Sequence, residues 1–122
     1  MKRWLALLVL ASVALAQIRV TVETPPPPTL VVGAEVRIGL VPGVVVLERV
    51  PEPQGILVVY RGSRVAEVYA HHHRDLVARG WTRVKYQVKD GRHQAEYRRG
   101  RAKAKLEVRE HKGRIEVRVK EG

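Results

Sequence analysis

The side chains best placed to do chemistry in this chain are basic, and the chemistry they suit is the binding of a polyanion. After residue 81, apolar and polar residues alternate, which is typical of strands that bury one face. The polar positions of these strands carry three acidic residues, Glu96, Glu107 and Glu116. They also carry twelve basic residues: Arg83, Lys85, Lys89, Arg92, Arg98, Arg101, Lys103, Lys105, Arg109, Arg114, Arg118 and Lys120. If the strands form one sheet, these side chains share its water-facing side.

Turn-forming residues predict how the strands pair. Asp90-Gly91 is a strong signal for a two-residue hairpin turn, and Arg99-Gly100 is a second turn candidate. With these turns the facing pairs are complementary: Lys85 with Glu96, Glu96 with Lys103, and Arg92 with Glu107. A turn around residues 111–113 that sets Val108 against Ile115 would instead oppose like charges: Lys105 with Arg118, Lys103 with Lys120, and Glu107 with Glu116. Directly opposed like charges destabilise a sheet, so this pairing favours a surface that a polyanion neutralises.

The candidate partners of this face are DNA, RNA, an anionic polysaccharide, phospholipid headgroups and lipopolysaccharide. Contact with phosphate requires only positive charge and donors. Tyr86 and Tyr97 are expected to point into the core, so base stacking is not expected. The alternative is a solvated face that keeps the protein soluble. Abundant Glu, Lys and Arg, with no Cys or Asn and one Met, is also typical of thermophilic proteins.

The histidines raise a metal hypothesis that their spacing disfavours. Adjacent helical residues diverge in direction, so His71, His72 and His73 do not converge on one ion. His71 and Asp75 are spaced four apart and form a weak candidate for a surface metal site, but no metal site is expected. His72 is expected in the core, and His93 on the core side of the sheet. A pH-responsive role for either one stays open.

Few residues could support catalysis, and the chain is not expected to be an enzyme or to hold a cofactor. Beyond residue 16 the only serine is Ser63 and the only aspartates are Asp75 and Asp90. There is no glycine-rich phosphate loop and no metalloprotease or serine-hydrolase motif. The absence of cysteine excludes disulfide scaffolds, zinc fingers, cysteine nucleophiles and lipoprotein anchors.

Residues 1–16 have the three-part layout of a secretory signal peptide. Lys2 and Arg3 precede a short apolar run, and Ala14-Leu15-Ala16 offers small residues at a cleavage site. An uncleaved anchor is the alternative, but the run is shorter than a membrane-spanning helix of about 20 residues. We therefore expect an exported protein in the periplasm or outside the cell, with no transmembrane segment after cleavage.

Charge is distributed unevenly along the chain. The formal net charge of the whole sequence is +11. Without Lys2 and Arg3, 21 basic residues stand against 12 acidic ones. Residues 17–78 carry six of each sign, whereas residues 79–122 carry fifteen basic and six acidic residues. The whole excess of +9 therefore lies in the second part of the predicted domain.

Periodicity and turn signals predict the elements that position the basic residues. The expected elements are a strand at 17–23, a proline connector at 25–28, an apolar stretch at 30–40 broken at Gly33, a turn at 41–43, a strand at 44–50, a loop at 51–55, a buried strand at 56–60, a helix at 64–79 and then a four-stranded meander. Ser63 is the expected N-cap and Gly80 the expected helix end. Val65, Val68, Tyr69, His72 and Leu76 form the helix's apolar stripe, which Ala66 and Val77 widen. Trp81 is the expected packing anchor.

These observations predict one α+β domain over residues 17–122. Its β region, residues 17–54, leads into a strand, a helix and a four-stranded antiparallel meander over residues 55–122, with the helix packed on one sheet face. The expected function is that of a non-enzymatic envelope protein that binds DNA or an anionic surface polymer through the basic face. The alternative is an accessory protein of a cell-envelope assembly that binds a protein partner.

Overall fold

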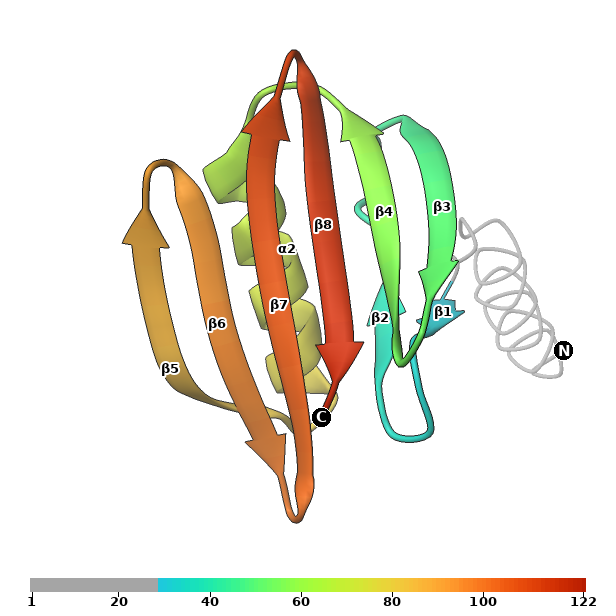
Figure 1. Ribbon diagram of the computed structural model, residues 1–122, viewed down its shortest axis with the longest axis vertical. Coiled ribbons are helices and arrows are strands. Elements are labelled where there is room, and N and C mark those ends of the chain that lie inside the picture. Colours follow the sequence, from blue (N-terminus) through green and yellow to red (C-terminus); the bar gives the residue numbers. More distant parts are fainter. Residues whose placement is uncertain (1–28) are drawn as a thin grey trace, which may run out of the picture.

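The computed structural model describes residues 29–122 and has the α+β fold expected from the sequence, with one helix packed on an antiparallel sheet (Figure 1). Its elements are β1 (Thr29–Val31), β2 (Arg37–Gly39), β3 (Val46–Glu52), β4 (Gly55–Arg61), α2 (Val65–Ala78), β5 (Thr82–Lys89), β6 (Arg92–Arg99), β7 (Ala102–His111) and β8 (Arg114–Glu121). The predictions of a signal peptide at 1–16, a strand at 17–23 and a proline connector at 25–28 lie outside the described residues.

Six strands form one sheet in the order β3-β4-β8-β7-β6-β5, and all neighbours are antiparallel. β5 to β8 are the predicted meander, and β4 joins it beside β8. As an interior strand β4 is buried on both faces, since Val58 and Val59 are 0% and 3% exposed. The predicted loop at 51–55 is wrong, because β3 continues to Glu52 and only Pro53-Gln54 form the turn. Pro51 is tolerated because β3 is an edge strand.

Helix α2 carries the predicted apolar stripe and ends as expected. Its buried residues are Val68, Tyr69, His72 and Leu76, and Val65 packs partly against them. Gly80 has a φ of 96°, a conformation that glycine adopts without a Cβ penalty. The chain can therefore turn sharply from α2 into the edge strand β5.

Two details of the predicted helix are wrong. Arg64, not Ser63, occupies the N-cap position, and no side chain caps the first turn. Ala66 and Val77 are exposed and do not widen the stripe, since Val77 is 48% exposed. The buried face of α2 is therefore narrow, and α2 lies behind the middle of the sheet (Figure 1).

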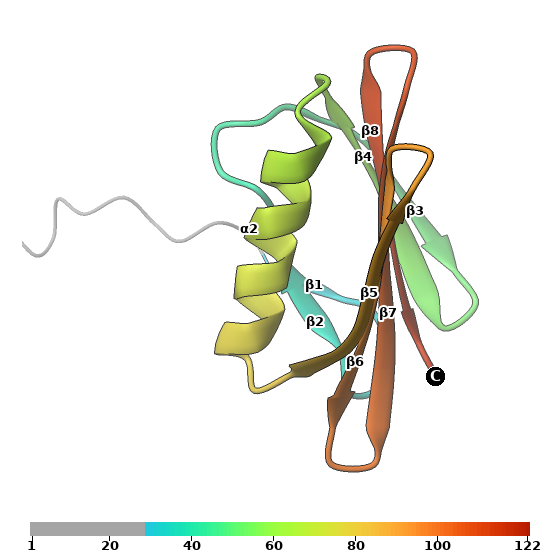
Figure 2. The same ribbon diagram turned by 90° about the vertical axis from the view of Figure 1, so that its left-hand side faces the viewer.

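The core lies between α2 and one face of the sheet (Figure 2). Leu76 and Val117 are 0% exposed and Trp81 is 2% exposed, so Trp81 is a packing anchor as predicted. The β1–β2 hairpin lies on the same side as α2, and the Gly39 N–H donates to the Asp75 carboxylate at 2.8 Å. The other face has no covering element among the described residues, and we call it the open face.

Arg99 joins three parts of the fold. Its guanidinium lies 4.7 Å from the centre of the Trp81 ring, a cation–π contact. It donates to the carbonyl of Arg79 at the end of α2 (3.0 Å) and to the carbonyl of Glu35 before β2 (2.8 Å). Arg99 thus belongs to β6 and faces the helix side, whereas the sequence predicted it in a turn.

Replacing Arg99 with Ala should destabilise the fold by roughly 2 kcal/mol, because three hydrogen bonds, one of them to the Glu35 carboxylate, and a cation–π contact are lost together. Chemical denaturation measures the free energy of unfolding. The matched control is Arg98→Ala on the exposed side of the same strand, which should change it by less than about 0.5 kcal/mol. Equal effects of the two substitutions would contradict the role given to Arg99.

Candidate functional site

The open face carries most of the predicted basic residues, but the β6–β7 register differs from the prediction. Arg99 pairs with Ala102, so the turn residues are Gly100-Arg101 and not Arg99-Gly100. Gly100 has a φ of 61°, which suits the first central position of a two-residue hairpin turn. Glu96 therefore faces Lys105 instead of Lys103.

The β7–β8 register also differs, and this overturns the argument from opposed like charges. Lys112 and Gly113 have φ values of 54° and 75°, as a two-residue turn with two left-handed residues requires. Val108 consequently faces Val117, not Ile115. The two acids gain basic partners: Glu107 faces Arg118, and Glu116 faces Arg109. One directly opposed like-charge pair arises in this hairpin, Lys105 with Lys120.

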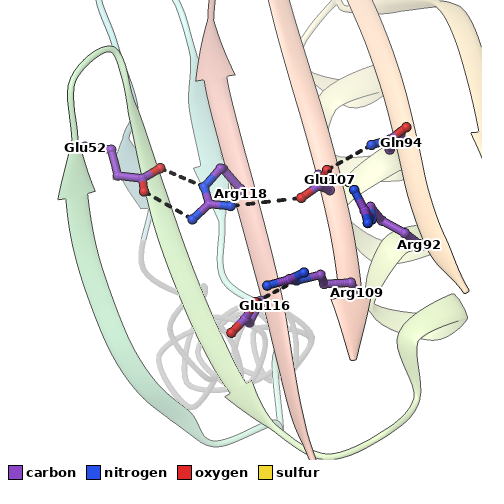
Figure 3. Close-up of polar contacts among 7 residues, drawn as sticks. All are labelled: Glu52, Arg92, Gln94, Glu107, Arg109, Glu116 and Arg118. Carbon is purple, nitrogen blue, oxygen red and sulfur yellow. Dashed lines mark hydrogen bonds and ion pairs between the residues drawn. The ribbon is translucent and has the colours of Figure 1, made fainter. Parts of the chain in front are cut away.

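Polar contacts cross the open face from β3 to β6 through Glu52, Arg118, Glu107 and Gln94, and Arg109 forms a separate pair with Glu116 (Figure 3). Arg118 donates to both carboxylate oxygens of Glu52, at 3.0 and 3.3 Å, and lies 4.0 Å from Glu107. The hydrogen bond with Glu52 raises the pKa of Arg118, so the guanidinium stays protonated. Arg109 donates to Glu116 at 2.8 Å. Four of the acids and four of the predicted site arginines thus neutralise one another: Glu48, Glu52, Glu107, Glu116, Arg92, Arg109, Arg114 and Arg118.

The remaining positive charge gathers at the end of the open face nearest the β6–β7 turn. We call this cluster the basic end, and it consists of Lys85, Arg98, Arg101, Lys103, Lys105 and Lys120. All six are exposed. Of these six residues only Lys85 forms an ion pair within residues 29–122, with Glu96 at 3.6 Å. Lys105 faces Lys120 across β7–β8, and Lys103 faces Arg98 across β6–β7. Paired residues on neighbouring strands have Cα atoms about 5 Å apart, so these charges are closely spaced.

Two predicted site residues belong neither to the carboxylate-paired arginines nor to the basic end. Arg83 is not on the open face, because a bulge between Arg83 and Lys85 reverses the alternation at the start of β5. Arg83 pairs with Tyr97 and faces the helix side, where it donates to the Tyr69 hydroxyl at 3.0 Å. Lys89 is exposed at the opposite end of β5, away from the basic end.

An aromatic cluster that the sequence did not indicate packs β5 against α2. Tyr69 stacks on Tyr86 and His93, with ring centroids 5.0 and 5.1 Å away, so His93 lies on the core side of the sheet as predicted and contacts α2. Tyr97 is fully buried as expected, and its hydroxyl lies 2.8 Å from Nδ1 of His73. Tyr86 is 40% exposed, contrary to the prediction, because β5 is an edge strand that α2 does not fully cover.

The side chains around the histidines do not form a metal site within residues 29–122. His72 is 0% exposed, and its Nε2 lies 3.0 Å from the Tyr60 hydroxyl. Asp75 is already engaged, by the Gly39 N–H and by Arg79, and is therefore not free to form a site with His71. Within residues 29–122 there is no group of three or more residues that could hold a metal ion.

Comparison with protein families, curated proteins and solved structures finds no match to this chain. In the part of the chain that the structure describes, no helix is long and apolar enough to cross a membrane.

His72 should make the fold less stable in acid. Burial, followed by repulsion from His71, lowers its pKa to about 4 from 6.5. Between these pH values the unfolded chain binds a proton that the folded protein does not, so stability falls as the pH drops from 6.5 to 4. The loss from this group approaches roughly 3 kcal/mol. Denaturant titrations at several pH values should show a smaller acid loss in His72→Gln than in the wild type, and an unchanged loss would contradict this assignment.

Arg118→Ala should destabilise the protein by about 1–2 kcal/mol, because Glu52 and Glu107 lose a shared partner at a half-buried position. Lys120→Ala is the matched control two residues further along β8, and it should change stability by less than about 0.5 kcal/mol. Thermal and urea unfolding of both variants measures the difference. A Lys120→Ala cost equal to that of Arg118→Ala would argue against the division of the open face into paired and unpaired charges.

Proposed function

We propose that this protein binds a polyanion through the basic end. The observation that carries the proposal is the contrast within one sheet face: four arginines are neutralised by carboxylates, while six neighbouring basic residues have a single acid, Glu96, among them. Concentrated, unpaired and exposed cations attract anionic polymers and release their counterions on binding. The like-charge pairs expected from the sequence do not form, but two others lie within the basic end, Lys105 with Lys120 and Lys103 with Arg98.

The proposal includes an exported, non-enzymatic role in the cell envelope. The apolar run with its basic start supports export, and the scarcity of nucleophilic and acid–base groups supports a binding role. Anionic polymers are components of that setting, so a cationic sheet face has a ligand of the right charge there.

An accessory protein of an envelope assembly is the second candidate, and the edge strand β5 favours it. Its eight residues are all exposed, and Val84, Tyr86 and Val88 are 55%, 40% and 52% exposed. A partner strand could pair with such an edge. In that case the basic end would be only solvated surface, and mutation of β5 rather than of the lysines would abolish binding.

Removing three charges of the basic end should weaken polyanion binding. The test variant is Lys103→Gln/Lys105→Gln/Lys120→Gln, and the probe is immobilised heparin eluted with NaCl. Each lost contact should lower the slope of log affinity against log salt by about 0.7–0.9, so the variant should elute at clearly lower salt than the wild type.

The matched control removes three charges away from the open face, Arg37→Gln/Arg64→Gln/Arg74→Gln. It has the same net charge as the test variant and should elute close to the wild type. If the two variants elute together, net charge and not the basic end determines retention. If the wild type fails to bind at low salt, the proposed function is wrong.

A further inference from the structure

A hollow borders the basic end on the open face. Its volume is about 460 Å³, and side chains of β5, β6, β7 and β8 line it, among them Lys85, Gln87, Gln94, Glu96, Lys105 and Glu107. Ligand sites in proteins typically have volumes of about 300–1,000 Å³. The hollow is therefore large enough for a few units of a polymer that extends over the lysines.

A row of hydrogen bonds fixes the amide groups inside the hollow. Gln94 Nε2 donates to Glu107 at 2.9 Å, and Gln87 Nε2 donates to Gln94 Oε1 at 2.8 Å. An ionised carboxylate only accepts hydrogen bonds, so Glu107 determines the orientation of Gln94, and Gln94 in turn determines that of Gln87. One N–H of each amide and the Gln87 oxygen take no part in this row of hydrogen bonds. The hollow therefore offers a ligand both donors and acceptors in fixed positions.

The charges around the hollow are of both signs. Lys85, Lys105, Arg118 and Lys120 attract anionic groups, whereas the carboxylates of Glu96 and Glu107 only accept hydrogen bonds. A polyphosphate chain offers only acceptors and would bring no donor to the carboxylate of Glu96, whose one ion pair is with Lys85. No Tyr or Trp side chain lies on the open face of the described strands, so nucleobases have no ring to stack on.

We propose that the hollow binds an anionic polysaccharide. The acidic groups of the sugar meet Lys85, Lys105 and Lys120, and its hydroxyl groups, which both donate and accept, meet Gln87, Gln94 and the two carboxylates. This proposal rests on the proposed function, because the same lysines attract the polymer. It adds the class of ligand, a polysaccharide, because the hydroxyl groups of a sugar can both donate to and accept from the polar groups that line the hollow.

The test compares two sulfated ligands that differ in hydroxyl groups and adds a nucleic acid as a third ligand. The probes are a heparin decasaccharide, poly(vinyl sulfate) of matched charge, which has sulfates but no hydroxyl groups, and a 20-nucleotide thymidine single strand. Titration calorimetry at one salt concentration should give the tightest binding for the decasaccharide. Gln94→Leu, which leaves the net charge unchanged, should weaken decasaccharide binding about 5- to 10-fold and leave poly(vinyl sulfate) binding unchanged.

Gln87→Leu on the exposed edge strand is the second variant. Thermal unfolding checks that each variant is folded before it is titrated. If neither sulfated probe binds the wild type, the proposed function itself fails. If both bind with equal affinity, or if Gln94→Leu weakens both equally, polyanion binding stands and the polysaccharide assignment is overturned. Tightest binding to the thymidine strand would overturn it in favour of nucleic acid.

Discussion

Two-residue turns set the register of the sheet that carries every charge on the open face. Gly100-Arg101 and Lys112-Gly113 fix which residues of β6, β7 and β8 face one another. A two-residue slip would leave every side chain on the same face of the sheet and would still change every cross-strand neighbour. The electrostatic character of the open face therefore depends on turn geometry.

Arginine and lysine have different parts in the resulting surface. The basic residues in the carboxylate network are all arginines, and Arg118 shows why, since its planar guanidinium reaches two carboxylates at once. The lysines at the basic end are compact, mobile charges on flexible stems. The carboxylate-paired arginines and the exposed lysines thus occupy different parts of one sheet face, and Arg98 and Arg101 lie with the lysines at the basic end.

Sequence reasoning predicted the fold class, the helix stripe, the meander and the burial of His72 and Trp81, because these follow from periodicity and apolar content. It did not predict the registers, since alternation is the same after a two-residue slip. It also misplaced Arg83, because a bulge that reverses alternation leaves no mark in the pattern. The candidate face was therefore found, but its division into a neutralised part and a basic end required the pairing.

We propose that ligand contact is confined to the basic end and the adjoining hollow. Amide chemical-shift mapping of the ¹⁵N-labelled protein with a heparin decasaccharide tests it most directly. If contact is confined in this way, the largest shifts occur at Lys85, Gln94, Lys103, Lys105 and Lys120, with little change near Arg109 and Arg114. Shifts spread over the whole open face, or centred on α2, would contradict it.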